Sequence, residues 1–169
     1  NNRIEFRVPA RGLIGFRGEM MTETRGTGIM HQQFDSYDAY AGDIPGRTRG
    51  ALIALEQGDV TAYALEGLQD RGQFICEPGD PVYQGQVVGI NNRSDDMVVN
   101  VVKKKNLTNH RATQTGDSVK ISQAIKMTLE QCIEFIDSDE LLEVTPKSLR
   151  IRKLYLDPHD RKRAEKEKV

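Results

Sequence analysis

The chain has 169 residues, of which 37% are hydrophobic and 29% charged, and its formal net charge is −1. This length and composition are typical of a globular protein with one large or two small domains, each with a real core. The sequence contains no run of about 18 apolar residues and begins with no signal-peptide pattern, so no membrane contact is expected.

The first 38 residues predict a strand, a helix and a second strand. Residues 3–8 alternate between polar and apolar side chains, as in a strand with one buried face. A helix with an apolar stripe is expected from about Arg11 to Thr24, and residues 29–37 resemble a second strand. A strand–helix–strand unit is half of a split βαβ, ferredoxin-like domain, so we expect the chain to begin inside a domain.

Residues 40–122 predict a mainly β region, because Gly-Asp turns separate short apolar runs. Residues 51–55 and 60–65 flank Gln57-Gly58-Asp59 and are expected to form a hairpin. Residues 81–90 suggest another short strand pair, and residues 97–102 a further strand. Many short strands with glycine turns favour a small barrel or sandwich.

The C-terminal third adds helices to this β region. Thr128 and Gln131 have the spacing of a capping box and predict a helix with Leu129, Cys132, Ile133 and Ile136 on its buried face. Strands are expected at 141–144 and 148–156, followed by a polar helix from 157 to 168. The predicted fold class is α+β: an incomplete ferredoxin-like half-domain followed by a mainly β, barrel-like domain with one or two helices.

The most informative stretch is the basic segment, defined as residues 103–113. It holds four permanent positive charges together with short hydrogen-bonding side chains, and it has little to bury. Lysine and arginine suit phosphate oxygens, whereas asparagine and threonine can reach RNA sugars and base edges. A lysine run without other signals is, however, more often a solvated face.

A second basic patch is predicted on the strand near residue 150. There Arg150 and Arg152 share one face of the strand and are followed by Lys153, so this patch is either a further RNA contact or an exposed edge. The residues predicted to bind RNA are Lys103, Lys104, Lys105, Thr108, Asn109, Arg111, Arg150, Arg152 and Lys153.

No catalytic residue and no metal site are predicted. The three histidines lack the spacing of a zinc site, and Gly26-Thr27-Gly28 lacks the Gly-Lys-Ser/Thr ending of a phosphate loop. The two cysteines, Cys76 and Cys132, are expected to be buried thiols in a reducing cytosol. An enzyme that uses either of them would require an exposed thiol of low pKa.

An alternative function follows from the separation of charge along the chain. Residues 121–149 contain six acidic and two basic side chains. The predicted helix there could present Glu130, Glu134 and Asp137 to a basic partner. The chain would then be a protein-interaction domain without direct RNA contact.

Several motifs, in order, resemble those of the BipA/TypA family of translational GTPases. The resemblance runs from Val8 to about Arg163 and therefore covers nearly the whole chain. The matching motifs occupy residues 8–17, 24–28, 67–72, 107–112, 127–131, 141–146 and 151–153.

The resemblance implies two parts and a place of action. Residues 1–38 resemble the second half of the domain V shared with elongation factor G, and residues 39–169 the C-terminal domain peculiar to the family. Family members are ribosome-dependent GTPases linked to stress adaptation and large-subunit assembly. Their C-terminal loop, here the basic segment, reaches the ribosomal A site, near the peptidyl transferase centre and the acceptor end of A-site tRNA.

The resemblance also sets expectations for cofactors. GTP or ppGpp, with magnesium, would be bound by an N-terminal domain outside this sequence, so this part would hold no cofactor and hydrolyse no GTP. We accordingly expect a cytoplasmic monomer whose partners are large-subunit rRNA and tRNA, with no membrane partner.

Overall fold

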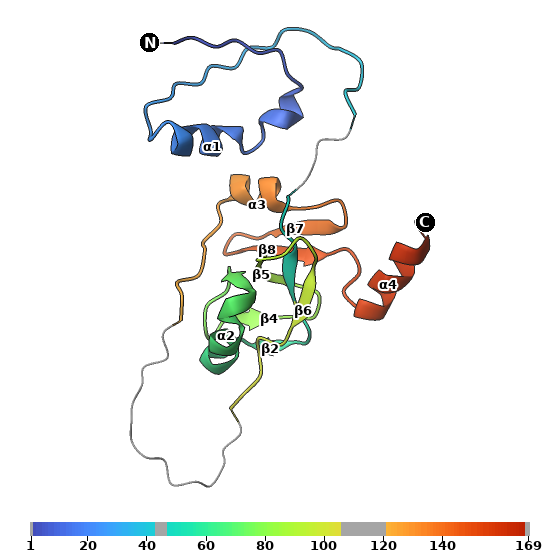
Figure 1. Ribbon diagram of the computed structural model, residues 1–169. Coiled ribbons are helices and arrows are strands. Elements are labelled where there is room, and N and C mark those ends of the chain that lie inside the picture. The colour runs from blue at the N-terminus through green and yellow to red at the C-terminus, as the bar shows by residue number, and fades with distance from the viewer. Residues whose placement is uncertain (1, 43–46, 106–120, 168–169) are drawn as a thin grey trace.

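A computed structural model describes residues 2–42, 47–105 and 121–167 (Figure 1). The fold is mixed α+β, as predicted. The helices are η1 (Ala10–Leu13), α1 (Phe16–Glu23), α2 (Ala62–Leu68), η2 (Gln69–Arg71), α3 (Leu129–Phe135) and α4 (Pro158–Glu167), where η denotes a short 3₁₀ helix. The strands are β1 (Ala51–Ala54), β2 (Gly58–Asp59), β3 (Gly72–Phe74), β4 (Pro81–Val82), β5 (Val87–Asn91), β6 (Met97–Val99), β7 (Glu140–Val144) and β8 (Leu149–Lys153).

The described strands form three separate sheets rather than one closed barrel. The largest has the order β3-β5-β1-β6, in which β1 is antiparallel to β5 and parallel to β6. β2 pairs with β4, and β7 pairs with β8 in an antiparallel hairpin. The barrel-like expectation is therefore corrected to an open sheet accompanied by two small ones.

The core lies on both faces of β1, whose four residues are all buried. Leu52 packs in a cluster with Leu65 of α2, whereas Ile53 packs in a second cluster with Cys132 of α3 and Ile151 of β8. Successive side chains of a strand point to opposite faces, so α2 covers one face of β1, and α3 with the β7–β8 hairpin covers the other. This central position explains why β1 is a continuous apolar run.

The N-terminal part is helical where predicted but has no strand. The expected helix is split into η1 and α1 at Gly15, whose φ of 79° lies in the left-handed region. No strand occurs among residues 2–42, so the strands predicted at 3–8 and 29–37 are wrong for this structure. A strand needs backbone hydrogen bonds to a neighbouring strand, and in the described part of the chain these two segments meet only through side chains, as in the 2.7 Å ion pair between Arg7 and Asp35. The apolar side chains of Ile4 and Phe6 are accordingly 72% and 74% exposed.

The predicted hairpin at 51–65 is also corrected. β1 forms, but the second half begins a helix because Thr61 is an N-cap: its side-chain oxygen accepts a hydrogen bond from the Ala64 N–H at 3.1 Å. The following Ala-Tyr-Ala-Leu run contains good helix formers, which outweigh the short strand-like pattern. β4 and β5 both exist, but β4 pairs with β2 and β5 with β1 and β3.

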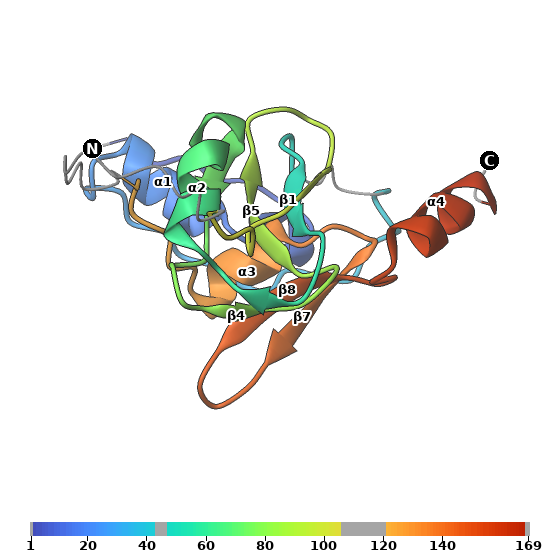
Figure 2. The same ribbon diagram turned by 90° about the horizontal axis from the view of Figure 1, so that it is seen from below.

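The C-terminal predictions are confirmed more closely. Thr128 and Gln131 form both hydrogen bonds of a capping box at the start of α3. β7 and β8 form the expected hairpin, and α4 projects from the side of the domain (Figure 2). Of the four residues predicted to form the buried face of α3, only Cys132 is fully buried. Leu129 and Ile133 remain 47% and 43% exposed. A two-turn helix over a small hairpin buries a single narrow stripe.

Candidate nucleic-acid interface

The basic segment leaves the domain at a point fixed by α2. Val101, after β6, is 1% exposed and belongs to the core. The Thr61 hydroxyl, which also caps α2, donates a 2.6 Å hydrogen bond to the Lys103 carbonyl oxygen, and the Thr61 N–H donates to the Val101 carbonyl at 3.0 Å. The first lysine is thus held by its backbone, while its side chain stays in solvent.

The chain returns to the domain at the other end of α2. Ile121 packs against the core, and both the N–H and the hydroxyl of Ser122 donate to the side-chain oxygen of Gln69 at 3.0 Å. Gln69 directly follows α2, and Thr61 directly precedes it. Both ends of the stretch between 103 and 122 are therefore fixed to one helix, an arrangement that the strand prediction at 60–65 missed.

The three lysines at positions 103–105 are exposed, and none has an ion pair within the described ranges. Three positive charges therefore stand together in solvent, and no carboxylate of the described residues pairs with them. Thr108, Asn109 and Arg111, predicted to complete this surface, lie outside the residues that the structure describes.

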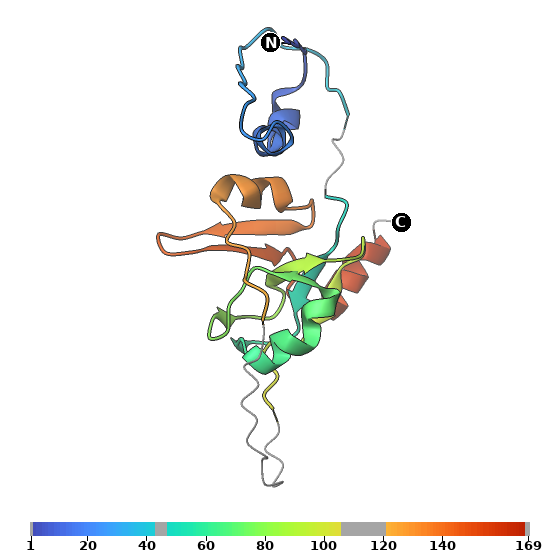
Figure 3. The same cartoon turned by 60° about the vertical axis from the view of Figure 1, so that its left-hand side comes forward.

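The second basic patch lies apart from the first. Residues 103–105 leave the domain below α2, whereas β8 lies toward α3 (Figures 1 and 3). Arg152 pairs with Glu143 at 2.9 Å, and the Tyr83 hydroxyl donates to the same carboxylate at 2.7 Å. Burial, and then this carboxylate, raise the pKa of Tyr83. Both arginines are partly exposed, but Arg150 has no ion pair among the described residues, so it is the freer of the two.

Lys153 corrects the predicted patch, because it is 2% exposed and cannot reach a phosphate. Its ammonium group contacts Asp96 at 2.5 Å and both Asp139 and Glu140 at 2.9 Å. The alternation of side chains along the strand could have predicted this burial. Lys153 lies two residues after Ile151, so both side chains point to the buried face, whereas Arg150 and Arg152 point to the other face.

Arg47 completes this group, which we call the buried ion cluster after its buried members Glu140 and Lys153: Arg47, Asp96, Asp139, Glu140 and Lys153. The side chains of Asp96 and Asp139 lie at its edge, 34% and 46% exposed. The guanidinium of Arg47 grips the fully buried Glu140 carboxylate with two hydrogen bonds, of 2.5 and 2.6 Å. It also lies 4.5 Å from the centre of the Phe135 ring. The cluster ties the residues just before β1 to β7, β8 and the loop before β6.

The buried ion cluster predicts a plateau of stability at intermediate pH. Burial alone would raise the pKa of Asp96, but hydrogen bonds from Ala51 and Lys153 hold it below the ordinary value of 3.8. Burial alone would lower the pKa of Lys153, but hydrogen bonds to Asp96, Glu140 and Asp139 raise it above the ordinary 10.5. The Asp96 contribution is complete above 3.8 and is lost as the pH falls through its lowered pKa. The Lys153 contribution is complete below 10.5 and is lost as the pH rises through its raised pKa.

Urea unfolding across the pH range checks this expectation. The free energy of unfolding should be nearly flat between about pH 5 and 8 and fall on both sides, and on the alkaline side the buried Cys76 thiol, whose pKa is raised to about 12, adds to the loss. Asp96→Asn keeps an acceptor for the Ala51 N–H but has no charge to titrate, so its acid limb should be shallower. Identical acid limbs in the two proteins would contradict the role given to Asp96.

The N-cap at Thr61 predicts a moderate loss of stability on substitution. Thr61→Val removes both the cap of α2 and the bond to the Lys103 carbonyl, and should lower the free energy of unfolding by about 1–2 kcal/mol. Thr48→Val is the matched control, because Thr48 is exposed and has no side-chain hydrogen bond among the described residues. Chemical denaturation of both variants makes the comparison. Equal losses would show that the Thr61 hydroxyl has no special role.

No feature of a catalytic or metal centre occurs within the described ranges. Cys76 and Cys132 are buried free thiols, as predicted, and burial raises the pKa of Cys76 to about 12. Such a thiol is the opposite of an activated nucleophile. Among the described residues no three His, Cys, Asp or Glu side chains gather as they would around a metal ion. No helix in this part of the chain has the length and apolar character needed to cross a membrane.

The acidic face of α3 is only partly free. Glu130 is exposed, but the Glu134 carboxyl group packs against Gly15, where an added Cβ would lie 2.1 Å from the Glu134 Cδ atom. Part of the face predicted to bind a basic partner is therefore occupied by the N-terminal part of the same chain.

Comparison with known proteins extends over both parts of the chain. Residues 49–158 match the family of the TypA/BipA C-terminal domain, and residues 1–48 match the elongation factor G C-terminus. The large ribosomal subunit assembly factor BipA of Escherichia coli K12 is 50% identical over 163 residues, which is 96% of this chain and 27% of that protein. The protein of the same name from Bacillus subtilis is 44% identical over 167 residues, 98% of this chain and 27% of its own length.

The chain thus spans about a quarter of the length of these relatives. The matches run through both parts of the chain and reach 50% identity, far above the level at which a shared fold could be the whole explanation. The chain therefore belongs to the TypA/BipA family and corresponds to the C-terminal part of the family's proteins.

Proposed function

We propose that this chain is the ribosome-binding part of a large-subunit assembly factor and that the basic segment contacts ribosomal RNA. The observation that carries the proposal is the group of three exposed lysines at 103–105, on a backbone held at both ends of α2. Unpaired cations on a fixed base can approach phosphates without breaking existing ion pairs. The name of the relatives, large ribosomal subunit assembly factor, supports the ribosome as the partner.

The residues divide into three roles under this proposal. Lys103, Lys104, Lys105 and Arg111 bind phosphates, and Thr108 and Asn109 reach sugars or base edges in large-subunit RNA near the peptidyl transferase centre, or in the acceptor end of A-site tRNA. Arg150 and Arg152 form a weaker second contact, since Arg152 already pairs with Glu143. Lys153 is left out of the interface because it is buried.

The rest of the protein supplies the chemistry in this proposal. GTP or ppGpp and magnesium bind in an N-terminal domain beyond this sequence, where GTP is hydrolysed, and the part described here positions that domain on the ribosome. The protein then works in the cytoplasm, as a monomer, in large-subunit assembly and stress adaptation.

The salt dependence of ribosome binding by the full-length protein tests the proposal. Each phosphate contact adds about −0.7 to −0.9 to the slope of log K against log salt. We expect the three lysines alone to contribute about −2 to −2.7 to this slope. A slope near zero would contradict phosphate binding and favour a protein contact, such as one on the acidic face of α3.

A further inference from the structure

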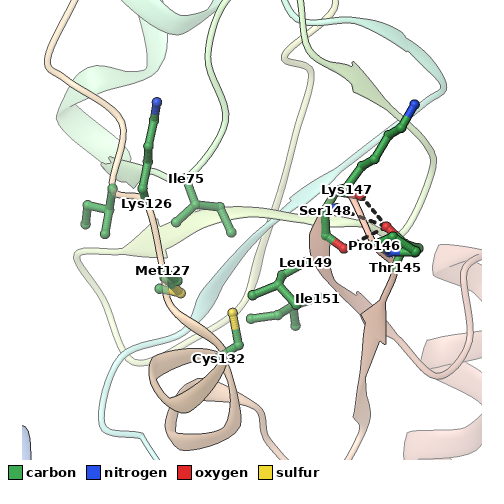
Figure 4. Close-up of a pocket in the computed structure, with 11 residues that line it drawn as sticks. Ile75, Lys126, Met127, Cys132, Thr145, Pro146, Lys147, Ser148, Leu149 and Ile151 are labelled. Atoms are coloured by element: carbon green, nitrogen blue, oxygen red, sulfur yellow. Dashed lines mark hydrogen bonds between the residues drawn. The ribbon is translucent and has the colours of Figure 1, made fainter.

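A groove of about 500 Å³ lies between the strand-to-helix connection at 125–127, α3 and the β7–β8 hairpin (Figure 4). It is on neither of the surfaces assigned to RNA above. Its size is within the range of about 300–1,000 Å³ that is usual for sites that bind small ligands or single side chains.

The floor of the groove is apolar. It is formed by Ile75, Met127, Cys132, Leu149 and Ile151, whose side chains converge in Figure 4. Cys132 and Ile151 are buried, whereas the other three are only partly covered. An aliphatic side chain of a partner would remove this remaining apolar surface from water.

The two ends of the groove are positively charged. Lys126 and Lys147 stand on opposite sides of the floor (Figure 4). Lys126 pairs loosely with Glu77 at 3.4 Å, and both side chains are well exposed, at 79% and 48%. Such an exposed pair is weak and exchanges readily for another carboxylate. Lys147 is exposed and has no ion pair within the described ranges.

The polar atoms of the hairpin tip are occupied within the tip itself. Thr145 and Ser148 exchange hydrogen bonds of 2.9 and 3.0 Å through their side chains and backbone. The described residues that line the groove include no aromatic ring on which a base could stack and few free groups that could read a base edge. These features favour a peptide over a nucleotide.

We propose that this groove binds an acidic peptide segment of a partner protein. One or two aliphatic side chains of the peptide fill the apolar floor, and flanking carboxylates pair with Lys126 and Lys147. The positively charged groove suits an acidic partner, whereas the acidic face of α3 would suit a basic one. The two surfaces are therefore separate and select different classes of partner.

The test uses the full chain with isotope-labelled Ile, Leu and Met methyl groups and a capped synthetic peptide in which two leucines are flanked by glutamates. Titration should shift the methyl signals of Met127 and Leu149. A peptide with serines in place of the leucines should bind at least about tenfold more weakly, because the apolar anchor is lost.

Charge reversal tests whether the lysines at the two ends of the groove bind the peptide. Lys126→Glu with Lys147→Glu should weaken binding of the leucine peptide at least about tenfold, since like charges then face each other. Lys162→Glu with Lys166→Glu on α4 makes the same change in net charge on exposed sites and should leave binding within about twofold. The thermal unfolding midpoint checks that each variant is folded.

Three results would overturn the proposal. They are no methyl shifts at millimolar peptide, equal weakening by the two charge reversals, and groove shifts caused by a single-stranded RNA oligonucleotide but not by the peptide.

Discussion

Replacing Lys153 by methionine is expected to lower the free energy of unfolding by about 3–5 kcal/mol, because it leaves the buried Glu140 carboxylate without one of its two counter-charges and leaves Asp96 and Asp139 without their shared cation. Lys153 is 2% exposed, and the Glu140 side chain that it contacts is 0% exposed. The remaining Arg47 cannot neutralise Asp96, Asp139 and Glu140 together. Urea denaturation at pH 7 measures the loss.

Arg150→Met is the matched control for this experiment. It removes one positive charge from the same strand, but from the partly exposed face, where Arg150 itself forms no ion pair among the described residues and Arg152 keeps its pair with Glu143. The expected loss is below about 1 kcal/mol. Similar losses in the two variants would show that the buried ion cluster does not stabilise the fold.

Replacing the three lysines at 103–105 by glutamine is expected to weaken ribosome association of the full-length protein at least about tenfold and to make the salt slope shallower by about 2 to 2.7. The side chains are exposed, so the unfolding midpoint should hardly change. Sedimentation with ribosomes at several salt concentrations measures both quantities.

The control removes the same charge from α4. Lys162, Arg163 and Lys166 are exposed, and replacing all three by glutamine lowers the net charge equally. This variant should bind within about threefold of the parent, because distant exposed charges are screened. If the α4 variant loses as much affinity for the ribosome as the lysine variant, then binding depends on the net charge of the protein and not on the basic segment, which would contradict the proposal.

The C-terminal half was predictable because its signals are local. The capping box at Thr128 and Gln131 and the alternation of β7 and β8 each lie within a few residues of the structure that they specify. The helix at 62–68 was missed because a single cap, Thr61, decides between strand and helix there. The segments at 3–8 and 29–37 have strand-like patterns, but no neighbouring segment in the described part pairs with their backbone as a strand would.

The charges of the candidate site were predictable from the sequence, but the hydrogen bonds that fix its two ends were not. The lysine run was visible in the sequence, whereas Thr61 and Gln69 hold its ends through contacts 42 and 53 residues away in the chain. Lys153 shows the opposite error. Its neighbours Arg150 and Arg152 suggested an exposed patch, although strand parity already placed it with Ile151.

Site-specific photocrosslinking on the ribosome tests the central claim most directly. A photoreactive amino acid in place of Lys105 in the full-length protein, bound to ribosomes, reports what the basic segment touches. We predict crosslinks to large-subunit ribosomal RNA near the peptidyl transferase centre or to the acceptor end of A-site tRNA. Crosslinks confined to ribosomal proteins, with none to RNA, would contradict the proposed role of this segment.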